Sequence, residues 1–73
     1  MDSKIDVPGI ILRAETAFGL SSDYQFAKFL GVRRSTVCNW KVRNSIDYEL
    51  LFSKCKGINL NWLIWGEGPI IRL

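Results

Sequence analysis

The sequence predicts an all-α fold, a compact bundle of about five short helices. Apolar residues recur at helical spacings, as at Ile10, Ile11, Ala14 and Phe18. No segment of useful length alternates between apolar and polar residues as a strand would. The chain has 73 residues, 48% of them hydrophobic, which is enough for the core of one small domain.

Turn and capping residues set the expected helix ends. Pro8 suits a first helical turn, and Gly19 suits the end of the same helix. The S-x-x-Q sequence at residues 22–25 predicts a capping box, Gly31 a helix end, and Asn59 the cap of a last helix. The expected helices cover residues 8–18, 23–30, 34–42, 47–56 and 60–65.

One folded domain is expected over residues 1–69, with a tail at residues 70–73. The sequence GEGP at residues 66–69 predicts a turn or linker. Ile70, Ile71 and Leu73 follow it, with no further segment left to cover them. The tail is therefore expected to be a C-terminal end or the start of a linker to a second domain.

Positive charge is concentrated in one segment. Between Asp23 and Asp47 the chain has no acidic residue but holds five of its ten Lys and Arg residues. A basic segment of this kind favours a polyanionic partner such as nucleic acid. The alternative is a basic face that only contacts solvent.

The spacing of small and apolar residues in this segment predicts two short helices joined by a tight turn. Ala27 leaves room for a close helix crossing, and Gly31 permits a sharp turn with positive φ. Such a helix-turn-helix, combined with the positive charge, points to binding of duplex DNA. The residues expected to form the core between the helices are Phe26, Ala27, Leu30, Gly31, Val32, Val37 and Trp40.

The face of the second of these helices opposite Val37 is expected to read DNA bases. At about 100° per residue, Ser35 and Asn39 lie roughly 160° and 200° from Val37 and therefore point outward. Arg can pair with guanine and Asn with adenine in the major groove, and Ser or Thr can bond to base or phosphate. The expected base contacts are Arg33, Arg34, Ser35, Thr36 and Asn39. Alternatively, Arg34 binds phosphate or stays free, and Asn39 is only a solvated helix residue.

Phosphate contacts are expected from residues around the same helix. Gln25 lies in the first turn of its helix, where the helix dipole favours anions, although its side chain alternatively only closes the capping box. The expected phosphate contacts are Tyr24, Gln25, Lys28, Lys41, Arg43 and Asn44. Together they would supply most of the affinity and a steep dependence on salt.

The composition argues against metal, catalytic and membrane roles. The chain has no His, and Cys38 and Cys55 alone cannot complete a four-ligand zinc site. A Ser or Cys nucleophile would lack its usual base, so we expect no enzyme and no cofactor. No stretch approaches the roughly 20 apolar residues of a membrane span, and no signal peptide opens the chain. We therefore expect a cytoplasmic protein with reduced thiols, although the sequence does not decide whether the two cysteines form a disulfide.

Three motifs resemble the N-terminal DNA-binding domain of bacteriophage CI-type repressors. They are GVRRSTVCNWKVRN at residues 31–44, IDYELL at 46–51 and INLNWLIWGEGP at 58–69. The resemblance implies a lambda-repressor-like helix-turn-helix fold. It also implies that residues 66–69 lead into an oligomerisation or regulatory domain outside these 73 residues. The base contacts that it implies are Arg34, Ser35, Thr36 and Asn39, and the core residues that it implies are Trp40 and Trp62.

Two positions depart from that family's pattern. Arg33 stands where Ser is expected as the N-cap, which removes a cap worth ~1 kcal/mol and places a cation at the positive end of the helix dipole. If Arg33 contacts DNA, this position serves DNA binding at the expense of the stability of the free helix. Trp65 replaces the usual Thr and, with Ile70 and Ile71, suggests a homodimer contact, because operators are usually palindromic.

The expected function is sequence-specific binding of double-stranded operator DNA. The protein would be a phage-type transcriptional repressor that controls a lysogenic switch by occupying its operator, at the nucleoid of a bacterial host. It would act as a homodimer, or as a higher oligomer through the second domain. The alternative is a protein-interaction module that reuses the helix-turn-helix core, which an absence of salt-dependent DNA binding would favour.

Overall fold

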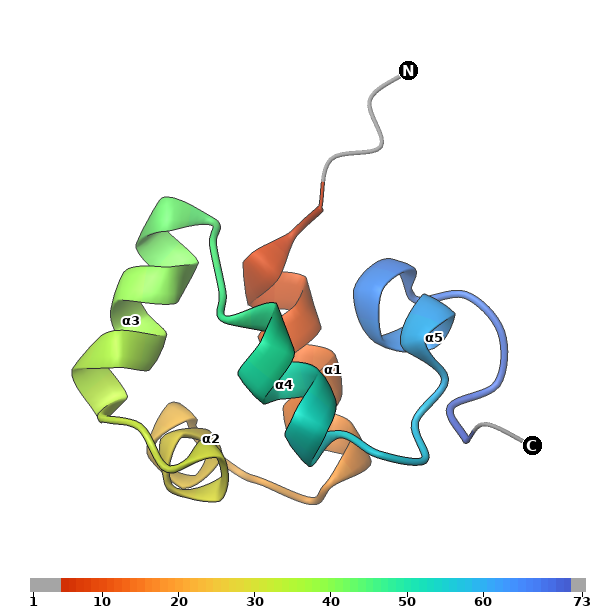
Figure 1. The fold of residues 1–73 in the computed structure, drawn as a ribbon, viewed down its shortest axis with the longest axis horizontal. Helices are drawn as coiled ribbons and strands as arrows, with labels where there is room; N and C mark the ends of the chain where they lie inside the picture. The colour runs from red at the N-terminus through yellow and green to blue at the C-terminus, as the bar shows by residue number, and fades with distance from the viewer. Residues whose placement is uncertain (1–4, 72–73) are drawn as a thin grey trace.

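Five helices build the domain in the computed structural model, which describes residues 5–71 (Figure 1). They are α1 (Val7–Ala17), α2 (Asp23–Leu30), α3 (Arg34–Arg43), α4 (Tyr48–Lys54) and α5 (Leu60–Trp65). The all-α fold predicted from the sequence is confirmed. Each expected helix is present, with its ends shifted by at most two residues.

Capping interactions explain where α2 and α4 begin. Ser22 Oγ accepts a hydrogen bond from the Gln25 amide at 3.2 Å, as the predicted capping box requires. The Gln25 side chain, however, accepts from the Ser21 amide at 2.7 Å, one residue earlier than the box predicts. α4 begins at Tyr48 because Asp47 is its N-cap. The Asp47 side chain accepts a hydrogen bond from the Leu50 amide at 3.1 Å.

The core contains side chains from all five helices. Of the residues predicted to lie between α2 and α3, Val32 and Trp40 are half-buried against the core, as is Trp62 of α5. Gly31 is exposed, so its predicted place in the core is wrong. An added Cβ there would meet no atom within 4 Å, and the position requires glycine only for its φ of +81°. The buried residues are Val7, Ile10, Ile11, Ala14, Phe26, Ala27, Leu30, Val37, Ile46, Leu51, Cys55, Ile58 and Leu63.

α1 packs against three of the other helices, α2, α3 and α5, and α2 in turn contacts α3 and α4. α3 lies at one edge of the molecule and α5 at the opposite edge (Figure 1). Arg13 ties α1 to α5, because its Nε and Nη2 donate to the carbonyl oxygens of Leu63 and Ile64, both at 2.7 Å. The arrangement leaves α3 as one outer side of the domain.

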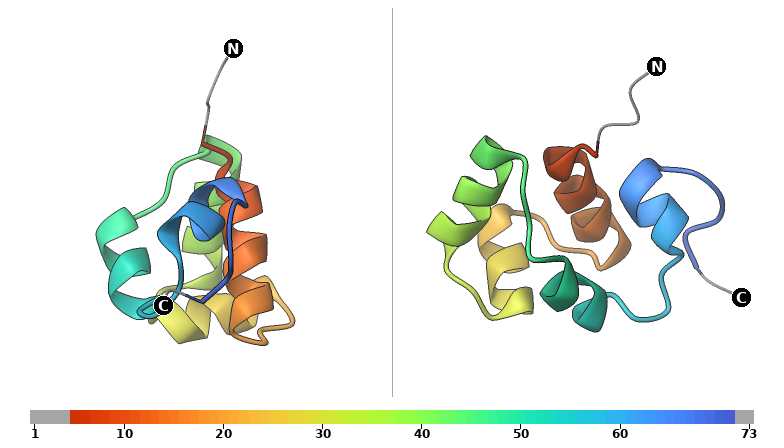
Figure 2. Two further views of the ribbon diagram at one scale, coloured as in Figure 1. Left: turned by 90° about the vertical axis from the view of Figure 1, so that its right-hand side faces the viewer. Right: turned by 45° about the horizontal axis from the view of Figure 1, so that its top comes forward.

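The chain after α5 returns to the segment that joins α4 to α5 (Figure 2). Ile71 pairs with Ile58 in an isolated antiparallel bridge, and the Asn59 amide donates to the Ile70 carbonyl at 2.8 Å. The expectation that nothing covers this tail is therefore wrong for its backbone, although the side chains of Ile70 and Ile71 stay 40% and 56% exposed. Leu73, the third apolar residue of the predicted tail, lies outside the described residues.

Candidate nucleic-acid interface

The turn between α2 and α3 fixes the two helices relative to each other. Gly31 adopts a left-handed conformation, and its amide and that of Val32 donate to the Ala27 carbonyl at 2.8 and 3.0 Å. Arg33 then takes an extended conformation and begins α3 as its N-cap. Within α3, Val37 is fully buried against the core. One face of α3 is thereby docked, and the opposite face is left in solvent.

The solvent-facing side of α3 borders an open hollow of about 350 Å³. Arg34, Ser35 and Asn39, three of the predicted base contacts, lie together there and are exposed. Arg33 is exposed at the start of the helix, and Thr36 is half-buried. The residues that line the hollow are Asp23, Arg34, Ser35, Cys38 and Asn39.

Four of the five bases in the acid-free segment are available to a polyanion. Lys28, Arg33, Arg34 and Arg43 are exposed and form no ion pair within residues 5–71. The Lys28 ammonium lies 5.7 Å from the centre of the Tyr24 ring, which is itself part of the exposed surface. These four side chains therefore carry positive charge that no ion pair neutralises among residues 5–71.

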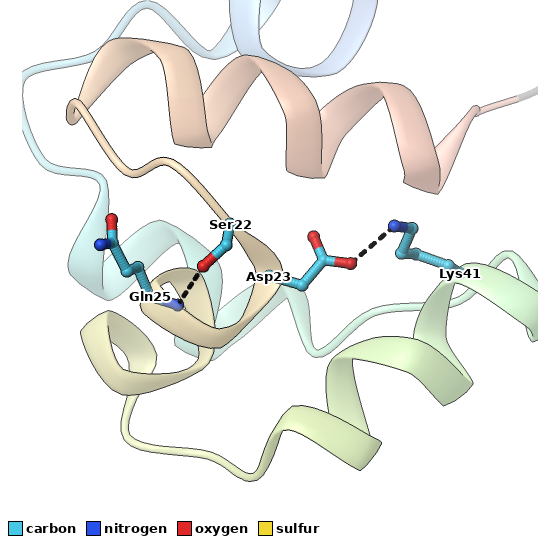
Figure 3. Close-up of polar contacts among 4 residues, drawn as sticks. All are labelled: Ser22, Asp23, Gln25 and Lys41. Atoms are coloured by element: carbon cyan, nitrogen blue, oxygen red, sulfur yellow. Dashed lines mark hydrogen bonds and ion pairs between the residues drawn. The ribbon is translucent and has the colours of Figure 1, made fainter.

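Two other expected phosphate contacts make bonds inside the protein. Lys41 Nζ donates to Asp23 Oδ2 at 2.7 Å, which raises the pKa of Lys41 (Figure 3). Asn44 ends α3 in a left-handed conformation; its Oδ1 accepts from the Val7 amide and its Nδ2 donates to the Ile5 carbonyl, both at 2.8 Å. Lys41 thus ties α3 to α2, and Asn44 ties the end of α3 to the start of α1.

Sequence reasoning missed two acidic residues next to this surface. Asp23 borders the hollow, and hydrogen bonds from Glu15 and Lys41 lower its pKa. The pKa of Glu15 is raised to about 7, chiefly by burial and then by its hydrogen bond to Asp23 and the charge of that carboxylate. No spacing rule joins Glu15, Asp23 and Lys41, because they belong to three different helices.

The two cysteines are free thiols, Cys38 exposed in the hollow and Cys55 buried in the core. Burial raises the pKa of Cys55 to about 11. Over residues 5–71 no three side chains of the His, Cys, Asp or Glu type gather as they would around a metal ion. No helix in that part of the chain has the length and apolar character needed to cross a membrane.

Residues 9–71 match the family described as the Bacteriophage CI repressor helix-turn-helix domain. The chain belongs to this family. The resemblance drawn from the three motifs is confirmed, and the CI-type domain is accordingly a DNA-binding domain of transcription regulation, in a family that is not a class of enzymes. No significant similarity links the chain to a curated protein or to a solved structure.

Arg33, at the start of α3 in this CI-type domain, allows a direct test of whether one residue lowers stability while it strengthens DNA binding. Arg33 is the N-cap but makes no side-chain capping bond. Arg33→Ser should stabilise the fold by ~1 kcal/mol, raising Tm by roughly 4–8 °C, and should weaken DNA binding because a cation is lost. Thermal unfolding and fluorescence anisotropy measure the two effects.

Lys56→Ser is a matched control for Arg33→Ser, since it removes an exposed cation between α4 and α5, away from α3. It should change neither Tm nor DNA affinity appreciably. If Arg33→Ser lowered both quantities, Arg33 would not have the role assigned to it.

Proposed function

We propose that this domain represses transcription by occupying operator sites in double-stranded DNA, within a phage-type switch that maintains lysogeny. The supporting observation is the construction of α3, in which Val37 anchors one face while Arg34 and Asn39 stand exposed on the other. An occupied operator that overlaps a promoter would exclude the polymerase. The protein would therefore act on the DNA of its bacterial host, at the nucleoid.

In this proposal the exposed face of α3 reads bases, and the cations around it bind phosphate. Arg34 and Asn39 have the side chains that form paired hydrogen bonds with guanine and adenine. Lys28 on α2 and Arg43 at the end of α3 are both exposed, and they supply the salt-dependent part of the affinity. Lys41 acts differently, because Asp23 already holds its ammonium group.

A homodimer is the form in which we expect the domain to bind. Helix-turn-helix proteins usually read two half-sites about one helical turn apart, related by the two-fold axis of a dimer. Trp65, Ile70 and Ile71 are apolar and 43%, 40% and 56% exposed, which supports a contact between copies. A selection of binding sites from random duplex DNA should yield a palindrome. A motif without symmetry would argue against the dimer.

Asn39→Ala and Arg43→Ala separate base reading from phosphate binding. Asn39→Ala should relax the preference at one base pair of the selected site, at a cost of ~1–3 kcal/mol on the matched sequence and little on a mismatched one. Arg43→Ala should weaken binding to matched and mismatched sites alike. It should also reduce the slope of log affinity against log salt concentration by the amount that corresponds to one phosphate contact. Anisotropy titrations at several salt concentrations measure both.

Both side chains are exposed, so neither substitution should disturb the fold, and thermal unfolding serves as the check. Identical behaviour of the two variants on matched and mismatched DNA would overturn the division of roles. A wild-type protein without salt-dependent binding to any duplex would overturn the proposed function itself.

A further inference from the structure

A cluster of three ionisable side chains joins α1, α2 and α3 behind the proposed DNA-binding surface. Asp23, the first residue of α2, accepts from Lys41 Nζ of α3 at 2.7 Å, and Figure 3 shows this pair next to the ribbon of α1. Glu15 of α1 completes the cluster through a hydrogen bond between its carboxyl group and that of Asp23. The Asp23–Lys41 pair is about one-third exposed, whereas Glu15 Oε2 is buried without a hydrogen-bond partner among the described residues.

A hydrogen bond between two carboxyl groups requires one proton, because two carboxylates have no donor to offer each other. Asp23 already accepts from an ammonium group, so the proton belongs on Glu15. The charged groups that act on this pair are the Lys41 ammonium, which acts on both carboxyl groups, and the Arg34 guanidinium, which acts on Asp23; both belong to α3, and the Cys38 thiol acts on Lys41. The pKa shifts agree with this assignment, since that of Glu15 is raised to about 7 and that of Asp23 is lowered.

We propose that Glu15 is a positioning residue for DNA binding: its proton holds Asp23, Asp23 holds Lys41, and α3 is thereby kept in its binding position. Because the effect is on DNA binding, it rests on the function proposed above. When Glu15 loses its proton, two adjacent carboxylates compete for the single ammonium of Lys41. Asp23 is the member with room to move, since it borders the open hollow beside Arg34 and Asn39. A displaced carboxylate there would neutralise Arg34 or face DNA phosphates.

The proton on Glu15 also links folding to pH. Since the pKa of Glu15 rises from 4.5 to about 7 on folding, its contribution to stability is complete below pH 4.5 and is lost as pH rises through about 7. Asp23 and Lys41 shift in the directions that keep them charged throughout this range. The chain has no His, and Glu15 is the described side chain whose pKa falls between 6 and 8.

The experiment measures affinity for the selected operator duplex between pH 6 and 8 at constant ionic strength. Wild type should lose roughly three- to tenfold in affinity across this range, because one coupled proton with a pKa near 7 allows about tenfold. Glu15→Gln carries a permanent amide donor for Asp23 and should bind with less than about twofold change over the range. Glu49→Gln makes the same substitution at an exposed site on α4 and should keep the wild-type profile.

Glu15→Ala distinguishes positioning from a simple charge effect, since it removes both the charge and the hydrogen bond. At pH 8 it should bind at least about threefold more weakly than Glu15→Gln, although the two variants have equal net charge. Unfolding curves without DNA confirm that each variant is folded. Equal affinity of Glu15→Ala and Glu15→Gln, or pH-independent binding by wild type, would overturn the role of Glu15 alone. Absence of duplex binding at every pH would instead overturn the proposed function, and the role of Glu15 with it.

Discussion

Replacing Val37 by aspartate should unfold the domain. Val37 is the one residue of α3 that is fully buried, so the introduced carboxylate would lie in the core without a partner. A buried unpaired charge costs roughly 4 kcal/mol or more. A domain of this size has a total stability of roughly 4–11 kcal/mol. We expect Val37→Asp to lose cooperative thermal unfolding and most of its helical circular dichroism, and DNA binding with them.

The same substitution at Val42 is the matched control. Val42 lies on the same helix but is 81% exposed, so Val42→Asp should leave the fold intact. It should still weaken DNA binding in a salt-dependent way, because a carboxylate near the phosphates repels them. Equal loss of structure in the two variants would mean that α3 is not docked through Val37.

Local signals account for most of what the sequence predicted correctly. The spacing of Ala27, Gly31 and Val37 is a pattern over eleven residues, and each position has a steric or conformational reason that does not depend on the rest of the chain. Helix ends are similarly local, since a cap or a glycine acts within one turn. The outward face of α3 followed from the position of Val37 alone, and Ser35 and Asn39 are indeed exposed.

The interactions that hold α3 in place were not predictable, because each depends on residues far apart in sequence. Asn44 accepts a hydrogen bond from the Val7 amide, 37 positions away in the sequence. The sequence around either residue gives no sign that the two are in contact. Lys41 was assigned to phosphate on charge and position, whereas its partner, Asp23, lies 18 positions earlier on another helix. A sequence pattern gives the face of a helix but not which neighbour a long side chain reaches.

Arg13→Ala should destabilise the domain by roughly 1.5–3 kcal/mol, the range for hydrogen bonds made by a charged group. The guanidinium of Arg13 donates to two carbonyl oxygens near the C-terminal end of α5, Leu63 and Ile64, both at 2.7 Å. α5 has six residues, too few to be stable as an isolated helix, and depends on its packing against α1. Urea unfolding, followed by the fluorescence of Trp62 and Trp65, measures the loss.

Arg13→Lys keeps the charge but not the planar fork that reaches both carbonyl groups, so it should recover only part of the lost stability. Because α5 lies at the edge of the molecule opposite α3, folded Arg13→Ala protein should bind a duplex with a single half-site, which needs no contact between copies, with wild-type affinity. That combination, lower stability with unchanged affinity, differs in both respects from the higher stability and weaker affinity expected for Arg33→Ser. Full recovery by lysine would mean that charge near the end of α5, rather than the paired hydrogen bonds, joins the two helices.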